Sequence, residues 1–372
     1  MDRHNYKQHA YYLIYLVRCV LNGKVPAKEK LDKMDLNWLI NIANAHSLSA
    51  IAAYALESAG AYDKAFEEAK YMAIRRNIIL DTERARVLEK LNENGIWYMP
   101  LKGIILKDYY PQIGMRQMCD NDILFDINAR EKVEPIMSAL GFKTESFGKG
   151  NHDVYFKEPV CNFERHVSLF SLTSYKTLYS VFENKNVVPK LLKSDENSSE
   201  RKFNVNDLYV YLTAHEYNHF SSGGTGLRSL VDTYLFVKRH IDEFDEAYIA
   251  RQFDKIGIAE FEEKRRALAL DLFEGRPLDK QEKEFLDYYI FSGTYGNLYN
   301  KVTNKVDDGG KLSYLFKRLF PSMNGIKKSY PFFYKHKILL PFLFIYRLGL
   351  MITTRRKLVI NELKTLLKVK KS

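Results

Sequence analysis

Cysteine is scarce in this chain of 372 residues, which has three cysteines, at Cys19, Cys119 and Cys161. They lie far apart in the sequence, and none belongs to a CxxC pair. A disulfide framework needs an even set of cysteines, and a structural zinc site is usually built from closely spaced thiolates. The sequence therefore argues against both, and a reducing cytoplasm is the expected location.

Long apolar runs are also missing. Residues 1–24 carry His, Gln and Arg in and around their apolar part and have no small-residue cleavage site, which predicts an amphipathic helix rather than a signal peptide. Residues 338–351 are mostly apolar, but Pro341 and Arg347 interrupt them, so they are too short and too polar to span a bilayer. Lys335 and Lys337 precede this stretch. It could therefore lie on an anionic membrane, or it could form a helix that packs on the protein core.

The first 300 residues carry no net positive charge. Residues 301–372 hold 17 Lys and Arg and 3 Asp and Glu, whereas the other 300 residues hold 40 Lys and Arg and 43 Asp and Glu. The net charge of +11 therefore comes entirely from the last fifth of the sequence. This asymmetry predicts an anionic partner there, either nucleic acid or a membrane surface, with a solvated basic helix face as the alternative.

The composition is that of a folded protein, with 46% hydrophobic and 28% charged residues. A chain of this length is expected to form two or three domains. The pattern of apolar residues predicts four regions: a helical region at 1–94, an α+β core at 95–192, a helical domain at 203–300 and a basic helical region at 301–372. Residues 194–202 are polar and predict a flexible link.

The change from helical to strand-like periodicity comes at Ile96, directly after a long helix that we expect to end at Asn94-Gly95. The expected strands are 96–101, 120–125, 142–147, 153–157 and 162–170. A helix is expected over 129–140, with Asn128 as its N-cap and Gly141 just after its end. Together these elements predict a small mixed β-sheet with one or two helices packed on it.

Two carboxylates at the head of one strand are the clearest chemical signal. Asp120 and Asp122 are spaced by one residue, so their side chains point to the same face of the strand. Two neighbouring anions repel each other and are usually stabilised by cations, and oxygen ligands suit Mg²⁺. This pair predicts a metal site.

A phosphate-binding turn is predicted about 20 residues before the pair. Gly103 allows a tight exit from a strand into a helix, whose first backbone N–H groups could bind phosphate. Lys102 and Arg116 flank this turn with positive charge. The chain has no Walker A motif, GxxxxGK[ST], which excludes the P-loop as an alternative.

A third carboxylate is expected from the last strand. Glu164, His166 and Ser168 stand at alternate positions and therefore share one face, opposite Phe163, Val167 and Leu169. If that strand neighbours the first pair, Glu164 completes a three-carboxylate site. An ordinary solvent-facing glutamate is the alternative, and His166 and Ser168 either line the same cleft or are simply exposed.

A rival motif lies further along the chain. His215, Glu216 and His219 match HExxH, in which two histidines on one helix face bind zinc and the glutamate acts as general base. Glu243 could be imagined as a third ligand. However, the two histidines continue an apolar stripe with Leu212 and its neighbours, which favours buried structural histidines.

The string LKGIILKDYYPQIGMRQMCDNDILFD at 101–126 resembles the uncharacterised bacterial nucleotidyltransferase family of the polymerase-beta-like nucleotidyltransferase superfamily. That family shows LKG, an aromatic-Pro turn, an Arg and a D-x-D strand. The similarity extends to 162–170, to 215–232 with its HxxxHF and GLRxLVD, to 292–296 and to 330–347. On this resemblance, the HExxH string is a family HxxxH formed by His215 and His219, and Glu216 is incidental to it.

The resemblance implies a nucleotidyltransferase core flanked by N-terminal and C-terminal helical regions. Lys102 and Gly103 match the phosphate turn, Asp120 and Asp122 match the metal-binding pair, and Glu164 matches the third carboxylate. The implied cofactor is Mg²⁺, with two ions expected and Mn²⁺ as an alternative. The implied substrate is an NTP.

The sequence departs from the superfamily pattern at two positions. Ile104 follows Gly103, where Ser or a second Gly is usual, and the third carboxylate is Glu rather than Asp. The expected activity is transfer of an NMP from an NTP to an acceptor, which could be a protein, an RNA, a sugar phosphate or a small molecule. Two alternatives stay open: an HExxH zinc metallopeptidase, and a non-catalytic nucleotide- or anion-binding protein with the same fold.

Overall fold

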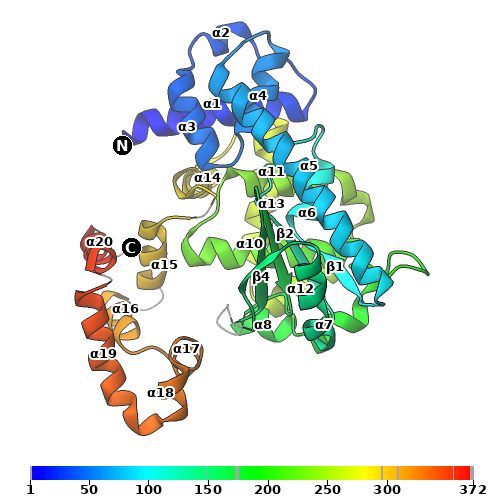
Figure 1. The fold of residues 1–372 in the computed structure, drawn as a ribbon. Helices are drawn as coiled ribbons and strands as arrows, with labels where there is room; N and C mark the ends of the chain where they lie inside the picture. Colours follow the sequence, from blue (N-terminus) through cyan, green and yellow to red (C-terminus); the bar gives the residue numbers. More distant parts are fainter. Residues whose placement is uncertain are drawn as a thin grey trace.

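The structure is a computed structural model that describes residues 2–148, 150–171, 176–294, 296–307, 310–354 and 356–368. It is an α+β protein in which one five-stranded sheet lies among many helices (Figure 1). The predicted fold class, a small mixed sheet flanked by helical regions on both sides in sequence, is confirmed.

The sheet has the strand order β1-β2-β5-β4-β3. Its strands are β1 (Tyr98–Pro100), β2 (Asp120–Phe125), β3 (Lys143–Ser146), β4 (His152–Lys157) and β5 (Cys161–His166). The pair of β2 and β5 is parallel, and the other three pairs are antiparallel, so the sheet is mixed as expected. The expected strand over 162–170 ends early, because the backbone leaves the ladder after His166.

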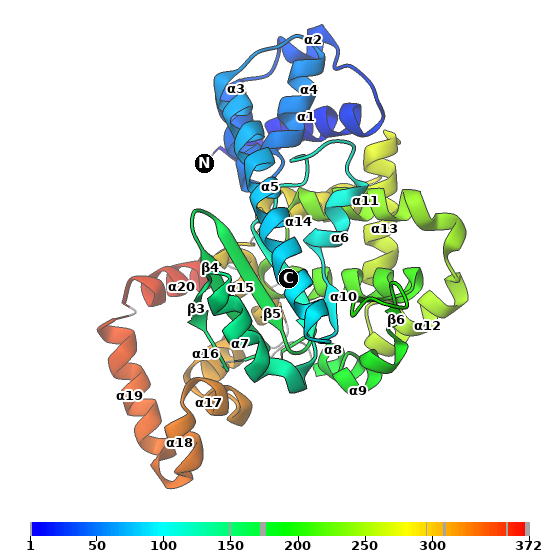
Figure 2. The ribbon, with the colours of Figure 1, turned by 45° about the vertical axis from the view of Figure 1, so that its right-hand side comes forward.

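Two helices cover one face of this sheet, as Figure 2 shows for α5 (Lys64–Glu93) and α7 (Arg130–Ala139). Their apolar side chains bury Ile123, Phe125 and Phe163 in a shared core. The side chain of Asp63 caps the start of α5. The expected N-cap of α7 is wrong: Asn128 lies inside a 3₁₀ turn η2 (Ile127–Ala129) that Asp126 caps, and the N-cap position of α7 is Ala129, which makes no side-chain capping hydrogen bond.

The N-terminal helices and several helices from the middle of the chain share one hydrophobic core. The N-terminal helices are α1 (Arg3–Leu21), α2 (Lys28–Leu31), α3 (Leu36–Ala45) and α4 (Ser49–Ser58). Their partners are α11 (Leu227–His240), α13 (Ala259–Glu274) and α14 (Lys280–Ser292). Leu13, Leu16, Leu230 and Leu268 are all completely buried in this core. Regions 1–94 and 203–300 are therefore held together by packing.

The opposite face of the sheet looks toward α10 (Val205–Gly223) and α11. Leu124 on the sheet and Tyr211 on α10 belong to the same core. Close by are the short helical elements α6 (Gly103–Leu106) and η1 (Lys107–Tyr109), and also α12 (Glu246–Ile256), which follows the turn η4 (Ile241–Glu243). The cleft described below opens between the carboxylate side of this sheet face and these helices.

Residues 176–202 are more ordered than their composition indicates. They form α8 (Lys176–Val181), α9 (Asn184–Val187), η3 (Val188–Lys190) and a hairpin of β6 (Leu192–Lys193) and β7 (Arg201–Lys202). The expected flexible link at 194–202 is wrong, because the backbone N–H of Tyr98 donates to the carbonyl of Ser199 and docks the hairpin on β1.

The last part of the chain forms an arm that projects from the body in both views (Figures 1 and 2). It contains α15 (Leu298–Asp307), α16 (Gly310–Leu319), α17 (Met323–Ser329), α18 (Pro331–Lys335), η5 (Lys337–Leu339), α19 (Leu340–Ile352) and α20 (Arg356–Lys368). The amide of Asn304 on α15 donates to backbone carbonyls of Phe220 and Ser221 on α10 and joins the arm to the body. Within the described ranges, no helix is both long enough and apolar enough to cross a membrane.

The interpretation of 338–351 as a helix packed on the main core is wrong. Leu343 of α19 is buried, but Phe342, Ile345 and Leu348 are largely exposed. The helix packs instead on its neighbours in the arm, where the Phe344 and Phe320 rings meet edge to face at 4.6 Å between ring centroids.

Candidate functional site

Three predicted carboxylates meet on one face of the sheet. Asp120 and Asp122 lie on β2, and the ladder pairs Asp122 directly with Glu164 on β5. Residues at alternate positions of a strand share a face, and directly paired residues on neighbouring strands do too, so all three side chains point the same way. All three line a cleft of about 500 Å³.

The carboxylates repel one another. Burial, together with the charges of Asp122 and Glu164, raises the pKa of Asp120 to about 7. Burial and the neighbouring Asp122 also raise the pKa of Glu164. Oxygen ligands that are held together at this electrostatic cost fit Mg²⁺, whose charge would offset the repulsion.

Lys102 is the cation nearest this group. Its Nζ lies 2.9 Å from Oδ1 of Asp122. Burial would raise the pKa of Asp122, but Lys102 and a hydrogen bond from His166 together hold it well below its ordinary value. The backbone of Lys102 has φ 48° and ψ −114°, a conformation that costs energy for a residue with a side chain. Lys102 therefore sits at a strained turn that aims its ammonium group at the carboxylates.

Gly103, the next residue, is closely packed against the ends of two side chains. A Cβ atom there would lie 2.5 Å from Nη1 of Arg116 and 2.9 Å from Cε of Met118. Ile104, which replaces the hydroxyl residue or second Gly of the wider superfamily pattern, is buried in the core between the sheet and α5. The residue after the glycine therefore serves packing in this chain.

Arg116 lines the cleft, but its guanidinium group already has partners. Its Nε and Nη2 donate to the two carboxylate oxygens of Asp232 at 2.8 and 2.9 Å, and Tyr110 donates to the same carboxylate. Arg228 donates to the backbone carbonyl of Gln117. Asp232 is thus held by Arg116 and Tyr110 from another part of the chain, and not by Arg228, which lies one helical turn before it.

Two histidines stand beside the carboxylates on the same face of the sheet. His166 follows Glu164 at the alternate position on β5, and the ladder pairs His152 of β4 directly with His166. The Nε2 atom of His166 lies 2.7 Å from Oδ1 of Asp122. Burial and the charge of Lys102 lower the pKa of His166 to about 4, so it is neutral at pH 7. The sequence indicated His166 but missed His152. Ser168 belongs elsewhere, since its hydroxyl donates to the carbonyl of Phe170.

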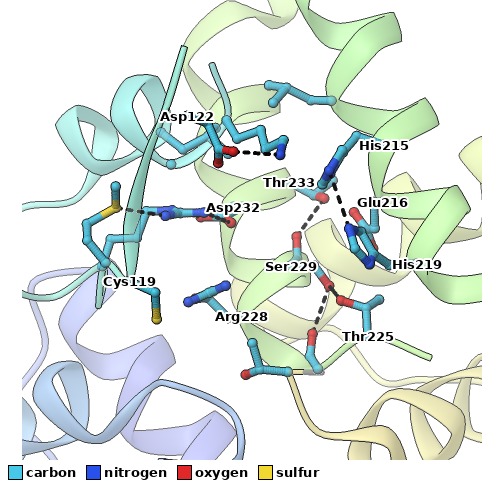
Figure 3. A pocket seen from close by; sticks show the side chains of 18 of the residues that line it. Cys119, Asp122, His215, Glu216, His219, Thr225, Arg228, Ser229, Asp232 and Thr233 are labelled. Carbon is cyan, nitrogen blue, oxygen red and sulfur yellow. Dashed lines mark hydrogen bonds and ion pairs between the residues drawn. The ribbon is translucent and has the colours of Figure 1, made fainter. Parts of the chain in front are cut away.

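The HExxH histidines line the cleft rather than the core, which corrects the prediction that they are buried. His215 and His219 lie on α10 across the cleft from Asp122, with 3.3 Å between their Nε2 atoms (Figure 3). Glu216, in contrast, is buried and accepts hydrogen bonds from Arg265 at 2.6 Å and Tyr289 at 2.9 Å. A glutamate bound in this way is a poor general base, and the imagined third ligand Glu243 is bonded to His240 instead.

The rest of the cleft wall is of mixed polarity, because Leu106, Met118, Leu212 and Phe236 line it together with polar residues. It includes Gln117, Cys119, Thr225, Gly226, Arg228, Ser229, Thr233 and Thr294. Thr225 and Ser229 are joined by their hydroxyl groups at 3.2 Å, and Thr233 donates to the backbone of Ser229. The glycine-containing loop before α11 therefore contributes to the cleft through Thr225 and Gly226. A cavity of this size with several polar groups is typical of a small-molecule site.

The fold and the carboxylate cleft define a protein of the nucleotidyltransferase type. Residues 32–274 match the family described as uncharacterised nucleotidyltransferase, and the chain belongs to that family. No curated protein and no solved structure matches the chain. The matched segment includes α5, the whole five-stranded sheet and the helices α10 and α11, so it contains both walls of the cleft.

Proposed function

We propose that this protein transfers a nucleoside monophosphate from an NTP to an acceptor, with Mg²⁺ as cofactor. The observation that carries the proposal is the placement of Asp120, Asp122 and Glu164 on one sheet face at the wall of the cleft. Membership of the nucleotidyltransferase family supports it.

The proposed reaction is a displacement at the α-phosphorus. An acceptor oxygen forms a new bond to the α-phosphorus, the bond from that phosphorus to the bridging oxygen breaks, and pyrophosphate leaves. The acceptor proton passes to a nearby base, for which Glu164 is the candidate because burial and Asp122 raise its pKa. Such transfers depend mainly on positioning and charge neutralisation, so no protein nucleophile is needed.

The roles of the side chains follow from their places. Asp120 and Asp122 would hold Mg²⁺, with two ions expected and Glu164 shared by the ion nearer the acceptor; bound Mg²⁺ neutralises developing charge on the phosphate oxygens. The Lys102-Gly103 turn would bind the triphosphate. Arg116, predicted for the same role, uses Nε and Nη2 for Asp232, so Nη1, which contacts Sδ of Met118, is the atom that could bind phosphate.

Label transfer from each α-labelled NTP in the presence of cell extract tests the proposal and identifies the nucleotide. We expect transfer by the wild-type protein and a loss of at least about a thousandfold in Asp122→Asn, because a two-metal site loses a central ligand. Asp126→Asn is the matched control, since Asp126 follows the same strand and caps the next turn.

The non-catalytic alternative has its own signature. If Mg²⁺–NTP binding is the same in the wild type and in the Asp120→Ala/Asp122→Ala variant, the carboxylates do not hold the metal–nucleotide complex and the enzyme proposal fails. The peptidase alternative is disfavoured by the hydrogen bonds that occupy Glu216. The following stay predictions: Mn²⁺ as a substitute ion, the acceptor class, a cytoplasmic location, a bacterial source and the relation to the polymerase-beta-like superfamily.

A further inference from the structure

The sheet face that carries the carboxylates also brings together a mixed nitrogen and oxygen cluster. Glu164 and His166 alternate on β5, and His152 is the ladder partner of His166 on β4. One ligand atom from each of His152, Glu164 and His166 lies within 4.8 Å of the others. The cluster sits beside the Asp120–Asp122 pair and shares Glu164 with it.

The spacing within this cluster suits a bound ion. Oε2 of Glu164 is 3.6 Å from Nε2 of His166 and 4.0 Å from Nε2 of His152. Ligands on a tetrahedral ion with bonds of about 2.1 Å are separated by roughly 3.4 Å. The three ligand atoms lie within 4.8 Å of one another, so the partly exposed His152 side chain would have to move by up to about 1.4 Å to bring all three pairs to this spacing.

The donor atoms select the kind of ion. Imidazole nitrogens favour first-row transition metals such as Zn²⁺, Mn²⁺ and Co²⁺, whereas Mg²⁺ prefers oxygen ligands and water. Metal binding by Nε2 of His166 would replace its hydrogen bond to Asp122, and Asp122 would keep its contact with Lys102.

We propose that His152, Glu164 and His166 bind a divalent transition-metal ion, next to the oxygen-only Mg²⁺ site of Asp120 and Asp122. The inference deepens the proposed function, since Glu164 is the carboxylate assigned to the ion nearer the acceptor. In this chain, the third carboxylate, Glu164, would then belong to a site that also has nitrogen ligands and prefers transition metals.

Co²⁺ titration of the metal-stripped full-length protein tests the proposal through visible absorption, without an activity measurement. We expect one Co²⁺ with a visible spectrum of a nitrogen- and oxygen-ligated ion, and His152→Ala to weaken its binding about tenfold or more. The matched control is His219→Ala, which removes an exposed histidine on the opposite wall of the cleft.

A cysteine at the same place gives a direct signature of ligation. In His152→Cys, bound Co²⁺ should gain a near-ultraviolet sulfur-to-metal charge-transfer band, which His219→Cys should lack. The proposal is overturned if His152→Ala binds Co²⁺ as tightly as the wild type, or if His219→Ala alone loses the ion. Mg²⁺–NTP binding that persists in either case leaves the proposed function standing.

The arm carries a second, independent observation. Many large apolar side chains on its helices are exposed, among them Leu312, Phe316, Ile338, Phe342, Ile345 and Leu367. Ile338 and Ile345 are 88% and 67% exposed. Its buried cluster holds only Val302, Val306, Tyr314 and Leu366 within the described residues. A protein surface of this kind usually marks an interface.

The charge of the arm indicates what covers this surface. Exposed Lys317, Lys327, Lys335 and Lys337 lie among the apolar side chains, within a region of 17 basic and 3 acidic residues. Nucleic acid would use the positive charge but leave the exposed isoleucine and leucine side chains in water. An anionic bilayer takes up both, with apolar side chains in the interface and lysines at the headgroups. We infer that the arm docks on an anionic membrane surface.

Co-sedimentation with vesicles tests the docking surface. The full-length protein should bind phosphatidylcholine vesicles that contain phosphatidylglycerol at least about tenfold better than pure phosphatidylcholine vesicles. Phe342→Ser/Ile345→Ser should lose this binding, whereas Met72→Ser, which removes an equally exposed apolar side chain from α5, should keep it. Three outcomes would each overturn the inference. The double variant could bind the anionic vesicles as well as the wild type does, or the wild type could bind RNA or DNA but no vesicles. The wild type could also form a dimer that the double variant disperses, without any vesicle binding.

Discussion

The ammonium group of Lys102 lies 2.9 Å from Oδ1 of Asp122, so a protein cation occupies the position beside the carboxylate that we assign to Mg²⁺. Lys102 therefore stabilises the metal-free protein and also competes with the metal. Asp122 is buried, and a buried carboxylate without a counter-ion is costly.

Lys102→Met separates these two effects. We expect the unfolding free energy without metal to fall by about 3 kcal/mol, because Asp122 loses its counter-ion. We also expect affinity for Mn²⁺ to rise about tenfold, because a positive charge next to the ion is removed. NTP affinity should fall. Urea unfolding measures the change in unfolding free energy, and calorimetric titration measures the affinities for Mn²⁺ and NTP.

Lys107→Met is the control for that substitution, since Lys107 is similarly buried and pairs with Asp81 outside the cleft. It should leave Mn²⁺ affinity unchanged. A Lys102→Met protein with lower Mn²⁺ affinity than the wild type would show that Lys102 does not compete with the ion.

Arg116 and Asp232 form a buried ion pair with two hydrogen bonds, and we predict that it is primarily structural. Arg116→Met and Asp232→Asn should each lower the unfolding free energy by about 3–5 kcal/mol, because each leaves a buried charge or acceptor without its partner. The double variant should lose much less than the sum. A denaturant-unfolding double-mutant cycle measures this coupling.

Arg228 offers the contrast within the same cleft. Arg228→Met should change stability little but weaken NTP binding, if its charge serves the substrate rather than the fold. Two results would instead support the direct triphosphate role that the sequence predicted for Arg116. The losses of unfolding free energy in the Arg116–Asp232 cycle would be additive, and Arg116→Met would have a lower NTP affinity at unchanged stability.

The sequence predicted the parts of the site that depend on local periodicity. Asp120 and Asp122 share a face because side chains alternate, and Glu164 joins them once its strand is the neighbour. The partner of Arg116 could not be predicted, because Asp232 lies 116 residues away and the pairing depends on how α11 packs. His152 was missed because its position opposite His166 depends on the register of β4, which no local pattern specifies.

The arm shows a different limit of sequence reasoning. An apolar helix such as α19 carries the same pattern whether protein or membrane covers it, so its exposure could not be predicted. The hairpin at 192–202 was not predicted for a related reason. The sequence of a polar edge strand resembles that of a loop, and only pairing with a neighbouring backbone distinguishes the two.

Gly103→Ala tests the close packing beneath the phosphate turn. The added methyl group would meet Arg116 and Met118 well inside contact distance, so we expect a loss of about 1–3 kcal/mol in unfolding free energy and weaker NTP binding. Gly223→Ala is the matched control, because its Cβ would meet no atom closer than 3.5 Å. Equal stability of the two variants in thermal and urea unfolding would contradict the proposed packing constraint.

His46 predicts a pH dependence that is separate from the cleft. It is completely buried at the end of α3, and its Nδ1 accepts a hydrogen bond from the backbone N–H of Leu227. Burial lowers its pKa to about 4, against about 6.5 in the unfolded chain. Between these values the unfolded state takes up a proton that folded His46 does not, so stability falls as pH decreases through this window.

From pH 7 to pH 5 we expect His46 to remove about 2 kcal/mol of unfolding free energy. His46→Asn keeps an acceptor for the Leu227 N–H but cannot be protonated, so it should lose this part of the pH dependence. Urea unfolding at several pH values measures both proteins, and the difference between their slopes cancels the contribution of His166, whose pKa is also lowered. Parallel pH profiles for the two proteins would show that His46 is not the group that destabilises the fold in acid.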